Sequence, residues 1–191
     1  MDTAARKRRI AFWSPLPPQR SGVADYSVEL LEQLTELCEV EIFVDDSYVP
    51  AIELYTRFVI YPDSTYELRH KQAPFDINVY HMGNNLFHRR MLAQAFAHPS
   101  LVVLRDVSLF DLYHHLWLST GQQREFLDEV EYACSSADRI RAKAMVNGTH
   151  PVDRLALMMT RRLIETSLGT IAHKCITTLS CLTAPWRRWG S

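Results

Sequence analysis

Residues 101–104 read Leu101-Val102-Val103-Leu104, an uninterrupted aliphatic run of strand length. Such a run has no polar side chain on either face, which is typical of a parallel strand that helices cover on both sides. Other short apolar or β-prone segments predict strands at residues 9–13, 40–44, 57–61 (a weaker candidate), 75–80 and 169–172.

Helical periodicity separates these strands. In the segment 23–37 the apolar positions recur at spacings of three and four residues and make one helical face. The same reasoning predicts helices at 86–97, 109–118, 122–135 and 139–145, and a further apolar stripe at Val152, Leu155, Ala156, Met159 and Leu163. Alternating strands and helices predict an α/β fold class, a Rossmann-like parallel sheet with helices on both faces.

The composition excludes several classes of protein. Of 191 residues 47% are hydrophobic, which argues against wholesale disorder. The net charge of −1 gives no general electrostatic grip on nucleic acid or anionic lipid. The 4 cysteines are scattered and form no CxxC pair, so neither a disulfide scaffold nor a structural metal site is expected.

The basic N-terminus, Arg6 to Arg9, precedes too few apolar residues for a secretory signal. No apolar run approaches the roughly 20 residues of a membrane helix, so no transmembrane segment is predicted. We therefore expect a cytoplasmic protein.

Three loops with unusual chemistry follow predicted strands, at 14–25, 81–85 and 105–108. Ligands of open parallel sheets bind beyond the carboxyl ends of the strands. The sequence therefore predicts that Gly22, His81 and Asp106 lie at one common edge of the sheet.

Ser21-Gly22 opens a helix directly after the first strand and its loop. Helix N-termini bind anions, and glycine lets a phosphate approach the backbone, with Arg20 as an added cation. The same two residues serve equally well as a helix cap and a turn. The loop has neither GxGxxG nor GxxxxGK[ST], which disfavours a nicotinamide dehydrogenase or a P-loop ATPase.

The other polar candidates also have two interpretations. His81, taken as a loop histidine, can hydrogen-bond a ligand hydroxyl or act as an acid or base, or be an ordinary surface residue. Asp106 can face a ligand or simply cap a helix or pair with a cation. His114 and His115 are adjacent in a predicted helix, so they should point apart and play a structural part.

Four motifs in order carry a resemblance to a known family. Residues 15–27, followed by Glu29-Leu30-Leu31, resemble the opening of the retaining, two-domain GT-B glycosyltransferases of family four. Residues 80–88 are similar to that family's second conserved loop, residues 102–109 to its third, and residues 161–173 to its fourth. The resemblance extends from about residue 9 to 173.

The resemblance implies an N-terminal half that mainly holds the acceptor and a C-terminal half that grips a nucleotide-sugar. The sugar passes to an acceptor hydroxyl with retention, with no cofactor and no required metal. By motif, the donor-diphosphate side is formed by Ser21, Gly22, Arg105 and Asp106. The acceptor side is formed by Asp25, Tyr26, His81 and Asn84. No catalytic residue is assigned.

The sequence departs from the family in two places. The third motif usually reads His-Asp, and Arg105 stands at the histidine position, where it cannot act as a base. Nothing after His173 resembles the donor domain, so we expect a GT-B N-terminal domain at 1–173 and an irregular tail at 174–191. This apparently truncated chain should then transfer no sugar alone, unless a separate chain supplies the donor domain.

Two other functions remain open at this point. One is a non-catalytic nucleotide- or partner-binding module of Rossmann-like fold. The other is an unrelated Rossmann-like enzyme such as a methyltransferase, whose glycine-rich first loop is absent here.

Overall fold

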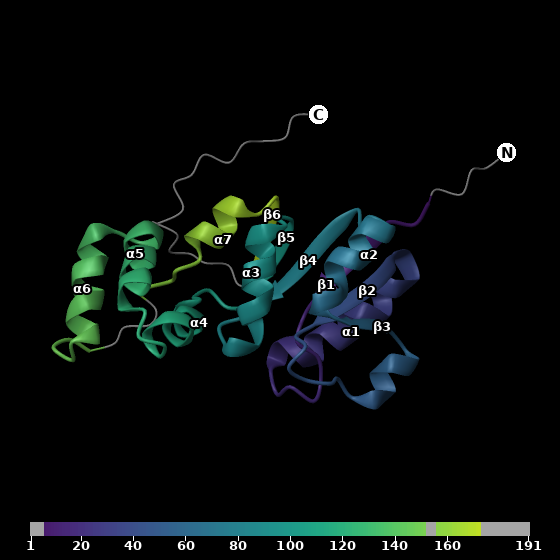
Figure 1. Ribbon diagram of the computed structural model, residues 1–191, viewed down its shortest axis with the longest axis horizontal. Coiled ribbons are helices and arrows are strands. Elements are labelled where there is room, and N and C mark those ends of the chain that lie inside the picture. Colours follow the sequence, from purple (N-terminus) through teal and green to yellow (C-terminus); the bar gives the residue numbers. More distant parts are fainter. Residues whose placement is uncertain (1–5, 152–155, 173–191) are drawn as a thin grey trace.

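A computed structural model describes residues 6–151 and 156–172 (Figure 1). Its centre is a parallel sheet with the strand order β3-β2-β1-β4-β5-β6. The strands are β1 (Arg9–Trp13), β2 (Glu39–Val44), β3 (Val59–Pro62), β4 (Ile77–Met82), β5 (Leu101–Leu104) and β6 (Gly169–Ala172). Each predicted strand is present, and helices flank the all-parallel sheet. The predicted α/β fold class is therefore confirmed.

The strand order reverses between β1 and β4. From β1 the chain moves outward to β2 and β3, then returns to place β4 on the other side of β1. Phe12 aligns with Ile42 on one side and with Val79 on the other, and Trp13 aligns with Tyr80. The loops after β1 and β4 therefore leave neighbouring strands in opposite directions, an arrangement that opens a crevice for ligands in sheets of this kind.

One face of the sheet is covered by α1 (Gly22–Leu37) and a 3₁₀ helix, η1 (Ile52–Thr56). Leu31 of α1 and Leu54 of η1 pack on Phe12, Ile42 and Ile60 of the first three strands. The apolar stripe of residues 23–37 is thus buried as its periodicity predicts.

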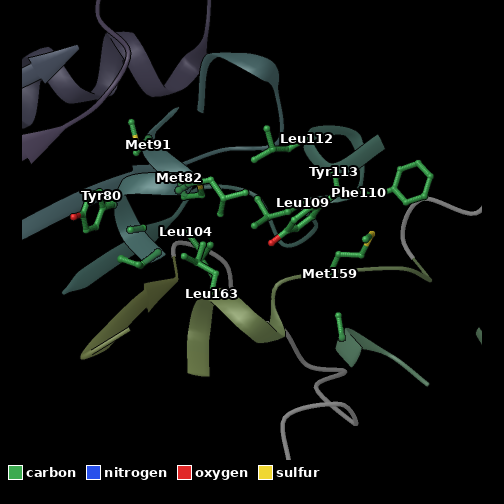
Figure 2. Close-up of a cluster of buried hydrophobic side chains, with 14 of the residues drawn as sticks. Tyr80, Met82, Met91, Leu104, Leu109, Phe110, Leu112, Tyr113, Met159 and Leu163 are labelled. Carbon is green, nitrogen blue, oxygen red and sulfur yellow. The ribbon is translucent and has the colours of Figure 1, made fainter. Parts of the chain in front are cut away.

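The other face is covered by α2 (Tyr66–Gln72), α3 (Arg89–Ala97) and α7 (Arg161–Thr166). Short 3₁₀ helices, η2 (Asp63–Thr65) and η3 (Leu86–His88), lead into α2 and α3. Figure 2 shows the core beside α7, where Leu163 lies close to Leu104 of β5 and Met82 of β4.

Between β5 and α7 the chain forms a helical excursion. It consists of α4 (Phe110–Tyr113), a π-helical turn (His114–Leu118), α5 (Gln123–Ala133) and α6 (Ser136–Val146). In Figure 1, α5 and α6 lie side by side, beyond α4 and far from β1–β3. Phe110 and Phe126 meet edge to face, with ring centroids 5.8 Å apart, and join this excursion to the core.

Two expectations about helices need correction. The apolar stripe predicted from Val152 to Leu163 is not one helix, because residues 157–160 are non-helical and α7 begins only at Arg161. Residues 152–155 lie outside the described part. The helix α2 was not predicted, since its sequence YELRHKQ has no apolar stripe.

The tail at 174–191 and the domain boundary before it also lie outside the described residues. Within the described ranges, no helix has both the length and the apolar character needed to span a membrane.

Candidate functional site at the carboxyl edge of the sheet

The N-terminus of α1 faces open space at the carboxyl edge of β1. Ser21 has an extended backbone, and its Oγ accepts a hydrogen bond of 3.1 Å from the Ala24 N–H. The first N–H groups of a helix, here those of Gly22 and Val23, have no partner within the helix. A Cβ added at Gly22 would meet no atom of the described residues within 4 Å. A ligand can therefore approach this backbone closely.

Arg105 brings a positive charge to the same helix. It directly follows β5, and its guanidinium lies over the ring of Tyr26, 4.1 Å from the ring centroid. Tyr26 is about one turn along α1 from Gly22. The Arg105 N–H donates to the carbonyl of Met82 at 2.9 Å, which fixes the β5 loop to the end of β4. The helix dipole and Arg105 together favour an anion here.

His81 is the penultimate residue of β4 and is completely buried, so its placement in a loop was wrong. Its ring lies 4.6 Å from that of Phe12 and 5.9 Å from that of Tyr26, between centroids. His81 Nδ1 and Ser27 Oγ are 3.1 Å apart, and a second hydrogen bond of 2.7 Å joins Ser27 to Ser14. His81 thus packs against the buried face of α1 through Ser27 and Tyr26. Contact between His81 and an acceptor stays a prediction.

The loop after β4 packs tightly, in contrast to the N-terminus of α1. A Cβ added at Gly83 would lie 2.7 Å from His88 Nε2 and 3.2 Å from Asp106 Oδ2. His88 is completely buried, and burial lowers its pKa to about 4 even though the Asp106 carboxylate favours the charged form. The His88 imidazole is therefore neutral at pH 7.

Asp106 and Asn84 join three segments. Asp106 Oδ2 accepts a hydrogen bond of 2.7 Å from the Asn84 N–H, so this carboxylate ties two loops together and does not cap α4, whose N-cap is Leu109. The Asn84 side chain donates to Asp111 at 3.1 Å and accepts from the Leu112 N–H at 3.1 Å. Both ends of this amide are used within the protein.

The predicted site residues therefore fall into two groups at one edge of the sheet. One group gathers around α1: Ser21, Gly22, Asp25, Tyr26 and Arg105, with His81 buried beneath it. The other, Asn84 and Asp106, holds the loops after β4 and β5 together. The common edge predicted for Gly22, His81 and Asp106 is confirmed.

Sequence reasoning missed three features of this edge. His88 lies within the second motif, but nothing in its neighbouring sequence indicates that it packs against Gly83. Ser27, an interruption in the apolar stripe of α1, was the only signal of the buried Ser14–Ser27–His81 chain. The predicted divergence of His114 and His115 is wrong, because their ring centroids are 5.5 Å apart and both side chains line one pocket.

Among residues 6–151 and 156–172 no group of three or more His, Cys, Asp or Glu side chains is placed to hold a metal ion. Searches with this chain found no matching family model, no matching curated protein and no matching solved structure.

Proposed function

We propose that the protein is the acceptor-side half of a retaining glycosyltransferase, in which the donor diphosphate lies against the N-terminus of α1. The observation that carries the proposal is the open approach to Gly22, where even a Cβ would contact nothing among the described residues. Since fold alone does not specify function, the support must come from this site and from the four motifs.

The site suits a diphosphate. The free N–H groups of the first turn donate to phosphate oxygens, and the helix dipole favours negative charge. Arg105, stacked on Tyr26, supplies a fixed cation at the same helix. Guanidinium groups bind phosphate in a bidentate manner and keep their charge at any physiological pH.

The same groups would assist sugar transfer. When the bond between the sugar and the diphosphate breaks, negative charge grows on the leaving diphosphate oxygen. Donors already aimed at that position stabilise the transition state without reorganisation. In this proposal Gly22 N–H and Arg105 hold the leaving group, and the segment after β4 holds the acceptor.

A second candidate is a nucleotide-binding module without transfer activity. It is favoured by Arg105, which stands where the resembling family has a histidine and which cannot take up a proton. The two candidates share nucleotide binding and differ in whether a second ligand is coupled to it. In a transferase, a bound acceptor changes the affinity for the nucleotide, whereas a simple binding module shows no such coupling.

The test is calorimetric titration of the chain with UDP, GDP and ADP and with the corresponding monophosphates. We expect one diphosphate to bind, and Gly22→Ala to weaken it at least tenfold because the methyl group fills the phosphate position. Arg105→Gln should also weaken binding, whereas Arg57→Gln, a matched change at the residue that follows η1, should not. Equal binding by wild type and Gly22→Ala, with both folded, would refute the proposal.

A further inference from the structure

A pocket of about 510 Å³ lies between the segment that follows β4 and the helical turns of residues 110–115. Residues 84–87, which follow β4, form one wall, and Phe110, Asp111, His114 and His115 form the other. The size is within the roughly 300–1,000 Å³ of small-molecule sites.

The walls of this pocket are fixed to each other. Asn84 joins them by its hydrogen bonds to Asp111 and to the Leu112 N–H, and Asp106 holds the Asn84 backbone. Asn85 Oδ1 accepts from the Phe87 N–H at 3.0 Å and so holds the start of η3. The pocket is thus preformed, which reduces the entropy lost when a ligand binds.

The lining combines exposed apolar surface with convergent polar groups. Leu86 and Phe87 are 47% and 40% exposed, and they lie opposite Phe110. Besides Asn84 and Asn85, the polar groups are the Asp111 carboxylate and the imidazoles of His114 and His115. A carboxylate accepts several hydrogen bonds at once, and a neutral imidazole donates at one nitrogen and accepts at the other.

This chemistry selects among ligands. None of the residues that line the pocket, all of them described, is Lys or Arg, and Asp111 repels anions. The Asp111 carboxylate already accepts from the Asn84 side chain, but a purely apolar ligand would take water away from it without offering a further hydrogen bond, which costs free energy. A ring with apolar C–H faces and several hydroxyl groups satisfies both kinds of surface.

We infer that this pocket binds a neutral sugar ring, with a C–H face against Phe87 and hydroxyl groups on Asp111 and His115. If the proposed function is correct, this sugar is the acceptor, which makes the acceptor a glycoside. The binding itself does not depend on a nucleotide at α1, so the two ideas can fail separately.

The experiment uses the complete chain and three probes, the methyl α-pyranosides of glucose, galactose and mannose, in saturation-transfer NMR titrations. We expect at least one to bind with a millimolar Kd. Asp111→Asn and Phe87→Ala should each raise that Kd at least tenfold. Leu68→Ala, on α2 and 60% exposed outside the pocket, should leave it unchanged. Gly22→Ala, which blocks the proposed diphosphate position, should also leave it unchanged.

Four results would overturn the inference. They are no binding of any of the three glycosides, unchanged binding in both pocket variants, equal competition by cyclohexanol, and tighter binding of glucose 6-phosphate than of the glucoside. Cyclohexanol tests for an apolar site and the sugar phosphate for an anion site. If thermal unfolding shows that Asp111→Asn is not folded, His115→Ala takes its place, because His115 is exposed and its truncation leaves the core intact.

Discussion

The loops after β1 and β4 leave neighbouring strands at the same edge of the sheet, and each contains a glycine with a different environment. At Gly22, which begins α1, an added Cβ would meet no described atom within 4 Å, so the space beside this glycine is empty. Beside Gly83 the room is already filled, since a Cβ there would lie 2.7 Å from His88 Nε2.

The difference separates two uses of glycine that look alike in sequence. At Gly83 the missing side chain serves the fold, because it admits the buried His88 ring and the Asp106 carboxylate. At Gly22 no described side chain needs the space, which leaves it open for the proposed diphosphate. Variants on the two sides should therefore separate loss of stability from loss of binding.

The largest expected effect is the pH dependence due to His88. Its pKa is about 4 in the folded protein against an ordinary value of 6.5, so the unfolded chain takes up this proton first. The stabilisation is present above pH 6.5 and is lost as the pH falls from 6.5 towards 4, by about 3 kcal/mol. Urea denaturation of wild type and His88→Gln between pH 4 and 7.5 measures it. Parallel stability curves for the two proteins would contradict this expectation.

The glycine pair gives the next largest effect. Gly83→Ala should lower the free energy of unfolding by about 2 kcal/mol, because a buried ring and a carboxylate must move. Gly22→Ala should leave stability unchanged or raise it slightly, since alanine is the better helix former. Chemical denaturation of the two variants side by side checks this. Similar losses in both would mean that Gly22 also has a packing role.

Asn84→Ala should cost about 1–2 kcal/mol. The change removes two side-chain hydrogen bonds and leaves the buried Leu112 N–H without its acceptor. Asn85→Ala, the matched neighbour, removes one exposed hydrogen bond to Phe87 and should cost less. Thermal unfolding ranks the two, and a larger loss for Asn85→Ala would show that Asn84 does not hold the walls together.

The smallest effect is expected at the cap of α1. Ser21→Ala removes the hydrogen bond from the Ala24 N–H and should cost about 1 kcal/mol of stability. The N–H groups of Gly22 and Val23 remain, so the affinity for a nucleoside diphosphate should change less than in Gly22→Ala. Calorimetry on both variants tests this order, and the reverse order would place the ligand on Ser21 itself.

Much of the fold could be predicted because it depends on local patterns. The aliphatic run of β5 matches a strand with buried side chains, and the apolar stripe of α1 matches a helix with one buried face. α2 could not be predicted this way, because it buries Tyr66 and exposes most of its charged residues. The stripe before α7 misled because Leu157 and Met159 are buried without being helical.

The sequence was enough to locate the site at one edge of the sheet, but not to predict the burial and contacts of its residues. Polar loops after strands were enough to place Gly22 and Asp106 at one edge. The burial of His81 depends on Phe12 and Tyr26, which are distant in the chain. The pocket at His115 is lined by residues of a π-helical turn, which no local pattern of residues predicts.

The strand order has a consequence for how the protein is made. The unit β1–α1–β2 is complete when residue 44 has been synthesised, but the other edge of β1 pairs with β4, which begins at residue 77. At a synthesis rate of roughly 5–20 residues per second, that edge of β1 stays unpaired for roughly 2–7 s while the chain is on the ribosome. During this interval an apolar strand has unpaired N–H and C=O groups, a template for pairing with another chain. The reversal of strand order that places β4 beside β1 thus leaves one edge of β1 unpaired while residues 45–77 are synthesised.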